Sequence, residues 1–216
     1  MQQPTKQTGI FHKTHPITLI LTMVTGLLLS SCKPKVLTGA ELQKYISKHE
    51  ALCQAQEVSG IKVETRYYPW QLLVKQELDA ASGSNKDTAY IRKLEAKYRK
   101  QYYFKLSFSK DNKEVIRQLG SYSRYSEMLQ MFSFSMRYYI NATTEKRDTA
   151  AIKDYAFEQD YGMSTANTLL VAFDKNSMKS AEDITVHIAE FGLGTGSLSY
   201  LFRRRDLESV PSLRYQ

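Results

Sequence analysis

The chain has 216 residues and a formal net charge of +8, from 30 Lys and Arg residues against 22 Asp and Glu residues. This length is enough for one domain with a proper hydrophobic core, and the sequence shows no internal repeat and no second domain. The basic charge suits anionic lipid, phosphate groups or an acidic protein as partners, or is spread over an ordinary solvated surface.

The first residues have the pattern of a secretory signal. Residues 1–16 carry Lys6 and Lys13 and no acid, and the apolar run Ile17–Leu29 follows them. That run is shorter than the ~20 residues that a membrane-spanning helix needs. A positive segment followed by a short apolar run predicts a signal peptide, with a retained membrane anchor as the alternative.

The run ends in Leu29, Ser30, Ser31 and Cys32. These four residues resemble the lipobox that the signal peptidase of bacterial lipoproteins recognises. The resemblance implies that residues 1–31 are removed and that Cys32, the new first residue, carries a lipid. The mature chain would keep a net charge of +6, because only the two lysines of the signal are lost. Cys53 would then be the one remaining thiol, which cannot form an intramolecular disulfide, and we expect it to be a buried apolar residue at a helix end.

The segment 32–38 is predicted to be a tether and 39–216 a single globular domain. Thr38 and Glu41 match a capping box, in which each side chain accepts a backbone hydrogen bond at a helix start. Asp87 is a second candidate helix cap. Ser59 and Gly60 predict a turn into a strand with alternating apolar residues. In the first half we predict a helix to about Ala51, a strand Ile61–Tyr67, a helix Trp70–Leu78, a loop Ala80–Lys86, a helix from Asp87 to about Gln101 and a strand Phe104–Ser109.

Apolar alternation and glycines define the elements of the second half. We predict one or two short helices over Glu114–Met131, broken near Gly120, then a strand Phe132–Ile140 and a polar excursion Asn141–Gly162. Further strands are predicted at Thr168–Phe173, Ile184–Ile188 and Leu198–Phe202, with a short turn from Arg203 to Asp206; the last two strands form a hairpin.

About six strands, with helices mainly in the N-terminal half, predict an α+β fold in which helices cover one side of an antiparallel sheet. A β-sandwich with peripheral helices is the alternative.

No catalytic, cofactor or metal site emerges from the motifs. The glycine spacing of Gly192–Gly196 is similar to that of a dinucleotide-binding loop. That motif needs a helix after the loop, whereas a strand is predicted here, so we interpret the segment as a hairpin turn. His49, Glu50 and Cys53 only approach a zinc-protease pattern, and His187 is the other mature histidine. The chain lacks a Gly-x-Ser-x-Gly elbow, and its acids form no pair that the sequence can place.

Two further features concern the surface of the mature chain. Thr88 and Thr149 each follow Asp and precede Ala, a short pattern associated with O-glycosylation in Bacteroidota envelopes. The helix after Asp87 has a basic outer face, which meets either solvent or an anionic membrane surface. The members of this face are Arg92, Lys93, Lys97, Arg99 and Lys100.

Several stretches of the chain resemble uncharacterised Bacteroidota-type envelope lipoproteins. They are the run Gly60–Pro69 with Leu72, Leu73, Glu77 and Leu78, and near the end Phe191–Gly194 and Ser209–Pro211. The resemblance implies lipid anchoring and carries no activity. Lys33 and Lys35 depart from the acidic residues that follow the cysteine in surface-exported members, which favours the periplasmic face of the outer membrane. We therefore expect a non-enzymatic binding or structural module that has a lipid, glycan or envelope-protein partner and no nucleic acid. A periplasmic hydrolase acting on cell-wall or glycan substrate is the alternative.

Overall fold

The computed structural model describes residues 36–81 and 87–215, which form one compact unit. The predicted signal peptide, the lipobox with Cys32 and most of the loop Ala80–Lys86 lie outside the described residues. Within the described ranges, no helix is both long enough and apolar enough to cross a bilayer.

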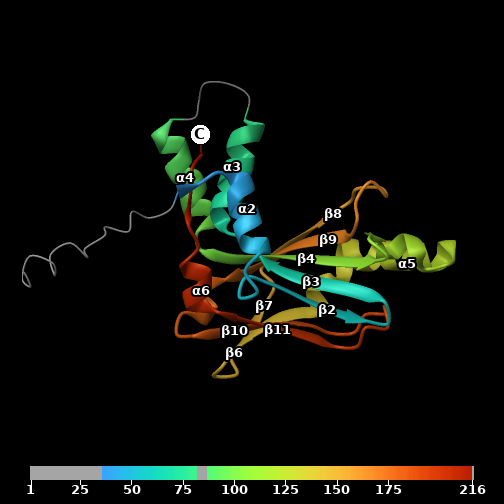
Figure 1. The fold of residues 1–216 in the computed structure, drawn as a ribbon. Coiled ribbons are helices and arrows are strands. Elements are labelled where there is room, and N and C mark those ends of the chain that lie inside the picture. Colours follow the sequence, from blue (N-terminus) through green and yellow to red (C-terminus); the bar gives the residue numbers. More distant parts are fainter. Residues whose placement is uncertain (1–35, 82–86, 216) are drawn as a thin grey trace, which may run out of the picture. The chain divides into compact units, whose positions relative to one another are not determined.

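The N-terminal half contains three of the helices (Figure 1). The capping box at Thr38 and Glu41 is confirmed, since each side chain accepts a backbone N–H from the other residue. Pro69 and Asp87 precede the next two helices, and Asp87 accepts the N–H of Tyr90. The helices are α2 (Gly39–Ser47), α3 (Trp70–Ala80) and α4 (Thr88–Tyr98).

The structure after the first helix differs from the prediction, and the helix after Asp87 ends at Tyr98 rather than near Gln101 because the next strand begins at Gln101. Helix α2 ends at Ser47 rather than near Ala51, because the backbone N–H groups of Leu52 and Cys53 both bind the carbonyl of His49 and turn the chain. Cys53 then begins β2 (Cys53–Val58), a strand that we did not predict. It is half-buried opposite Arg66 in the next strand, so it is not a buried helix-end residue.

The larger sheet is antiparallel and has six strands, in the order β2-β3-β4-β9-β8 with β5 paired to β4. Strand β9, which includes the predicted strand Thr168–Phe173, lies inside the sheet between β4 and β8. The strands besides β2 are β3 (Ile61–Tyr67), β4 (Gln101–Lys110), β5 (Lys113–Glu114), β8 (Asp154–Glu158) and β9 (Asn167–Asp174).

A second antiparallel sheet has four strands in the order β11-β10-β6-β7. Strands β10 and β11 form the predicted hairpin. The four strands are β6 (Ile140–Thr144), β7 (Thr149–Ala151), β10 (Asp183–Ile188) and β11 (Leu198–Arg203). A parallel pair, β1 (Val36–Leu37) with β12 (Ser212–Leu213), joins the two ends of the described chain.

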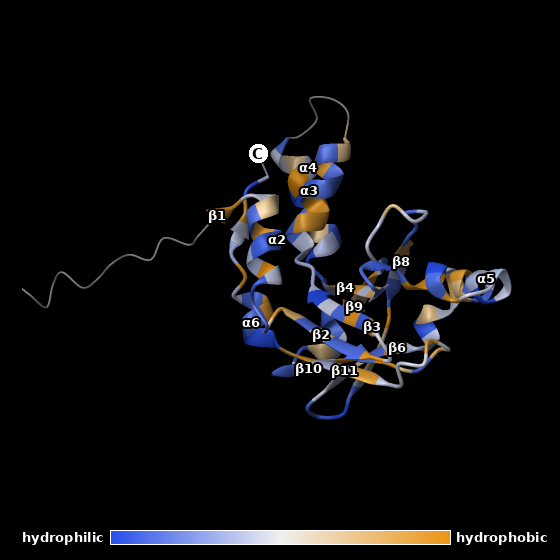
Figure 2. Ribbon diagram, turned by 45° about the vertical axis from the view of Figure 1, so that its right-hand side comes forward, coloured by the Kyte–Doolittle hydropathy of each residue, from blue (hydrophilic) through white to orange (hydrophobic). Residues whose placement is uncertain are grey.

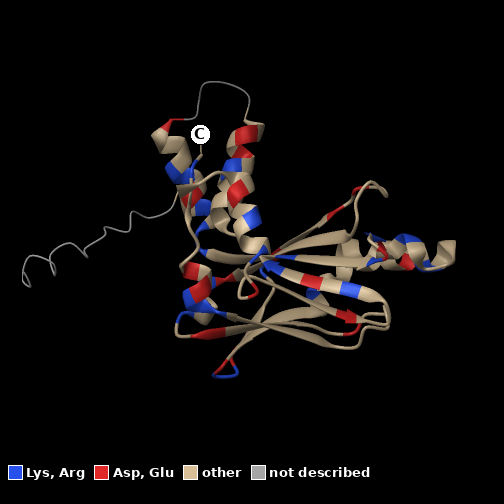
Figure 3. Cartoon of the chain, in the orientation of Figure 1, with Lys and Arg blue, Asp and Glu red and all other residues tan. Residues whose placement is uncertain are grey.

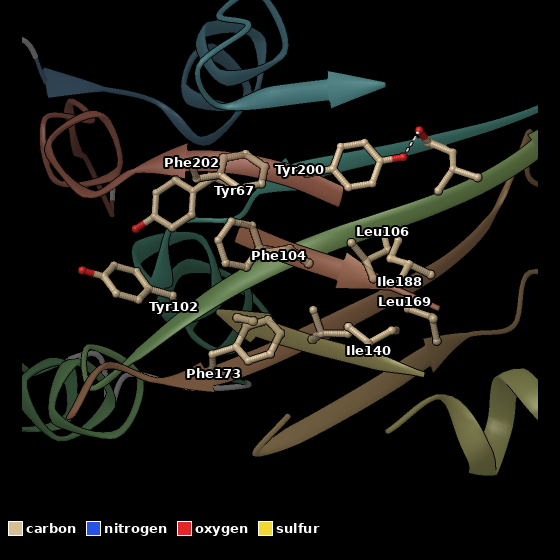
Figure 4. Close-up of a cluster of buried hydrophobic side chains, with 14 of the residues drawn as sticks. Tyr67, Tyr102, Phe104, Leu106, Ile140, Leu169, Phe173, Ile188, Tyr200 and Phe202 are labelled. Atoms are coloured by element: carbon tan, nitrogen blue, oxygen red, sulfur yellow. Dashed lines mark hydrogen bonds between the residues drawn. The ribbon is translucent and has the colours of Figure 1, made fainter. Parts of the chain in front are cut away.

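The main core lies where the two sheets face each other (Figure 4). The rings of Phe104 on β4 and Phe202 on β11 are 4.8 Å apart between centroids. Tyr200 on β11 donates a 2.9 Å hydrogen bond to the carbonyl of Val63 on β3. Each of these side chains is buried. The alternating apolar residues of both sheets therefore fill one shared interior.

Two glutamine side chains connect the edges of the sheets. Gln54 and Gln56 on β2 donate to the carbonyls of Leu201 and Ser199 on β11, the second at 2.8 Å. Strands β2 and β11 are the outer strands of their sheets, so the amides bind backbone groups that a neighbouring strand would otherwise use.

The predicted strand Phe132–Ile140 is wrong. The chain is helical from α5 (Tyr122–Gln130) through a π-helical turn, η3 (Met131–Ser135), to a 3-10 turn, η4 (Met136–Tyr138). Phe132 is buried, whereas Phe134 and Tyr138 are 75% and 79% exposed. The buried residues repeat every four positions, at Met128, Phe132, Met136 and Ile140.

The predicted excursion Asn141–Gly162 is also wrong, since it contributes to three strands, β6, β7 and β8. Small inward residues concealed the first two, because Ala142, Thr144 and Ala150 are buried without a bulky apolar pattern. The short helix before Gly120, η2 (Val115–Gln118), follows the prediction. The predicted turn from Arg203 to Asp206 is a helical turn, α6 (Arg204–Glu208).

The α+β class with a six-stranded antiparallel sheet and mainly N-terminal helices is confirmed. Helices α3 and α4 cover part of the face of this sheet that points away from the second sheet, through Leu73, Tyr98 and Tyr103. Figure 2 shows hydrophobic residues on both helices beside hydrophilic ones, as expected for helices with one buried side.

Candidate functional site

The glycine loop between β10 and β11 is filled by a side chain of the chain itself. The carboxylate of Glu190 accepts the backbone N–H groups of Gly192, Gly194 and Gly196 at 2.7, 2.9 and 2.5 Å. Each of these glycines has a positive φ, between 67° and 105°. Consecutive N–H groups in such a loop form an anion-binding nest, and here the anion is Glu190. The loop is therefore the predicted hairpin turn.

Burial and hydrogen bonding act on Glu190 in opposite directions. Desolvation raises the pKa of its carboxyl group, but the hydrogen bonds from the three glycine N–H groups outweigh it and the pKa is lowered. A lowered folded-state pKa adds stability above the unfolded-state value of about 4.3, and that stability is lost as the pH falls through the folded value.

We expect Glu190→Gln to lower the free energy of unfolding by about 1–2 kcal/mol at neutral pH, because hydrogen bonds to a charged acceptor are lost in a loop that is partly exposed. Urea unfolding at pH 7 and at pH 3 measures the effect, and the difference from the unsubstituted chain should shrink at the lower pH. Glu50→Gln is the control, since Glu50 is exposed. A difference that grows as the pH falls would contradict the role of the carboxylate.

The histidines and Cys53 do not converge. His49 binds the carbonyl of Tyr45 at 2.6 Å, next to α2. His187 on β10 binds Thr143 at 2.7 Å and Ser199 at 2.8 Å, and desolvation lowers its pKa. Across residues 36–81 and 87–215, no group of three or more His, Cys, Asp or Glu side chains is placed to hold a metal ion.

A pocket of about 290 Å³ lies beside α3 and α4 on the outer face of the six-stranded sheet. Leu170 and Ala172 of β9 form an apolar floor. The rings of Tyr98 on α4 and Tyr103 on β4 stand edge to face, 6.1 Å apart between centroids. We call this site the tyrosine pocket. Its lining residues are Leu73, Lys97, Tyr98, Gln101, Tyr103, Asp154, Tyr155, Ala156, Leu170 and Ala172.

Several polar side chains of the tyrosine pocket are already hydrogen-bonded to each other or to Glu77. Tyr103 donates to the Gln101 side-chain carbonyl at 2.6 Å, which leaves the amide N–H₂ of Gln101 as a donor. Lys97 and Tyr98 both donate to Glu77, Lys97 at 2.6 Å, so the charge of Lys97 is compensated. Burial, and then the neighbouring Tyr98, raise the pKa of Tyr103 to about 12, so its hydroxyl remains protonated.

Asp154 supplies the acceptor of the pocket. One of its carboxylate oxygens accepts the N–H of Tyr155 at 2.9 Å. The residue is exposed at the start of β8, the outer strand of the sheet. The pocket thus combines two aromatic rings, an apolar floor, an amide donor and a carboxylate acceptor, which is the mixture typical of small-molecule sites.

A larger hollow beside α6 has a different character. It measures about 500 Å³ and is lined only by charged residues, Glu182, Asp183, Arg203, Arg204, Arg205 and Glu208. Arg204 lies 4.0 Å from Glu208, and its guanidinium also donates to the carbonyl of Lys179 at 2.7 Å. The hollow mixes three basic and three acidic residues and has no apolar floor.

The sequence-predicted sites are not brought together. Thr88 begins α4 and Thr149 begins β7, and both are exposed. Leu29, Ser30, Ser31 and Cys32 lie outside the described residues. The tyrosine pocket was missed, although an aromatic residue at the end of the helix after Asp87 and another in the next strand were visible signals.

No family model, no curated protein and no solved structure matches the chain.

Proposed function

We propose that the protein is a lipid-anchored envelope module that binds a ligand in the tyrosine pocket and does no chemistry on it. The anchor is Cys32, through the resemblance of residues 29–32 to a lipobox, and the location is the periplasmic face of the outer membrane. The observation that carries the binding role is the pocket itself, where Tyr98 and Tyr103 stand over an apolar floor beside Gln101 and Asp154.

The ligand class that suits these groups is a neutral sugar unit of an envelope glycan. A sugar ring has an apolar C–H face that packs on an aromatic ring, and hydroxyl groups that donate to a carboxylate and accept from an amide. Compensation of Lys97 by Glu77 removes the strongest reason for an anionic ligand. A volume of about 290 Å³ limits the bound part to one small ring.

The test is a titration of the protein with an N-acetylglucosamine disaccharide. Trp70 is the single tryptophan of the chain and packs in the same cluster as Tyr98 and Tyr103, so its fluorescence reports on the pocket. We expect Asp154→Asn to weaken binding about tenfold, which corresponds to ~1.4 kcal/mol, because a charged acceptor is lost.

Two variants control this titration. Asp111→Asn makes the same chemical change at an exposed turn between β4 and β5, and it should bind like the unsubstituted chain. Tyr103→Phe removes the hydroxyl that holds Gln101 while keeping the ring. Saturation by the disaccharide with equal affinity in the Asp154 and Asp111 variants would contradict the assignment of the pocket, as would the absence of any binding at millimolar concentration.

A further inference from the structure

The described chain begins beside a set of unpaired basic residues. Val36 pairs with Ser212, and Leu37 accepts the N–H of Arg214 at 2.8 Å. Tyr215, the next residue, donates to Glu95 of α4 at 3.2 Å. The start of the chain and one side of α4 are therefore connected through three successive contacts.

Arg92 and Arg99 lie on the same side of α4 as Glu95. They are three residues before it and four residues after it, positions that neighbour one another on a helix surface. Lys93 is next to Arg92, and all three basic residues are exposed, as is Arg214. Within the described ranges these four side chains make no ion pair, whereas Lys97 is paired to Glu77.

We call Arg92, Lys93, Arg99 and Arg214 the entry-side basic surface. Figure 3 shows acidic residues on and beside α4 as well. Glu95 is the acid within α4 and accepts from Tyr215, and Asp87 precedes the helix as its cap, so both acids already have hydrogen-bond donors. Four basic residues against these two acids leave a net positive surface where the chain enters the domain.

The length of chain before Val36 sets how far this surface can stand from a bilayer. Four residue steps separate Cys32 from Val36, and a fully extended chain spans about 3.5 Å per residue. A lipid on Cys32 therefore keeps the first described residue within about 14 Å of the head groups, which is less than two screening lengths of about 8 Å each in physiological salt. Lys33 and Lys35 in this stretch add to the positive charge.

We propose that the entry-side basic surface rests on anionic phospholipid head groups and so orients the domain on the membrane. The proposal depends on the lipid anchor proposed above. The attraction of a few basic residues to an anionic surface is too weak to capture a free protein but is enough to orient a tethered one. Helix α5, at the opposite end of the domain from β1 in Figure 2, then points away from the bilayer.

The experiment uses the full chain, processed and acylated in bacteria and reconstituted into vesicles. A fluorophore is attached through Ala96→Cys, an exposed position of α4 between Arg92 and Arg99, or through Tyr122→Cys on α5, each in a Cys53→Ser background. It is quenched by lipids with a nitroxide at the head group. In vesicles rich in phosphatidylglycerol we expect at least threefold stronger quenching at position 96 than at position 122. The difference should vanish in purely zwitterionic vesicles, and also near 1 M salt, where the screening length is about 3 Å.

Charge variants assign the effect to the surface. Arg92→Glu with Arg99→Glu should abolish the difference in quenching, whereas Lys110→Glu with Lys113→Glu, the same charge change at the β4–β5 turn, should preserve it. Arg92→Gln with Arg99→Gln repeats the test without new acidic neighbours for Glu95. Equal quenching at both positions of vesicle-bound, acylated protein would overturn the orientation and leave the anchor standing. A chain that carries no acyl group and stays in solution would overturn both.

Discussion

Phe132→Ala is expected to lower the free energy of unfolding by about 3–5 kcal/mol, as is typical of removing a fully buried phenylalanine. The Phe132 side chain has no exposed surface. Its ring lies 5.1 Å from Phe108, 5.3 Å from Phe157 and 5.6 Å from Phe191, measured between centroids. These partners come from three other segments, so no single neighbour can move to fill the cavity.

Phe134→Ala is the matched control, because it makes the same chemical change two residues along the chain. Phe134 is 75% exposed, and its replacement should change the free energy of unfolding by no more than about 0.5 kcal/mol. Urea unfolding of both variants, compared at equal m-values, measures the contrast. Similar midpoints for the two variants would contradict the helical assignment and would restore the strand that the sequence suggested.

The failure at this segment has a physical cause. Residues 132, 136 and 140 are apolar, and positions four apart share a face both on a strand and on a helix. Only Phe134 and Tyr138 distinguish a strand from a helix here, and both are large apolar residues that are nevertheless exposed. A pattern search therefore favours a strand, whereas the chain continues helically from α5 through a π-helical turn. Such turns have no sequence signature of their own and occur often at functional sites.

Cys32→Ser should abolish acylation of the protein. In the lipid anchor proposed above, the thioether would form on the cysteine sulfur, and the peptidase that recognises a lipobox cuts only after that lipid is attached. One acyl chain anchors a protein marginally and two or three hold it stably, at about 0.8 kcal/mol for each buried methylene group. Labelling of growing cells with a radioactive fatty acid, followed by mass measurement of the purified N-terminus, checks the prediction.

The uncut precursor of the Cys32→Ser variant should remain in the membrane fraction through its apolar run Ile17–Leu29. A chain that begins at Lys33 behind an ordinary cleavable signal is the matched control and should be soluble and folded, because it keeps every residue of the described domain, from Val36 onward. A mature N-terminus at another residue, or normal fatty-acid labelling of Cys32→Ser, would remove the basis for the lipid anchor.

Local signals predicted much of the fold. The caps at Thr38 and Asp87, the alternation in Ile61–Tyr67 and the glycine turn before β11 each depend on a few neighbouring residues, and each is confirmed. Strands β6 and β7 were not predicted, because their inward-facing residues are alanine and threonine rather than bulky apolar residues. The pairing of the hairpin β10–β11 with β6 and β7 was not predicted either, since the two pairs of strands come from distant parts of the sequence.

The tyrosine pocket could not be predicted for a similar reason. Tyr98 and Tyr103 are close in sequence, but Asp154 and Leu170 reach them only through the pairing of β8 with β9 and of β9 with β4. Asp154 is one exposed acid among many in the sequence, and only this strand order gives it a place beside two aromatic rings.

The glutamine bridges between β2 and β11 bear on how the sequence can vary over time. Gln54 and Gln56 bind the main-chain carbonyls of residues 201 and 199, and every amino acid has such a carbonyl. Substitutions of Leu201 and Ser199 therefore leave the bridges intact. Substitution of either glutamine, in contrast, removes the hydrogen bond that this side chain makes to β11. Selection on this seam should fall on the two amides of β2, while the exposed Leu201 can drift. The side chain of Ser199 has a separate partner in His187 and is constrained by that contact.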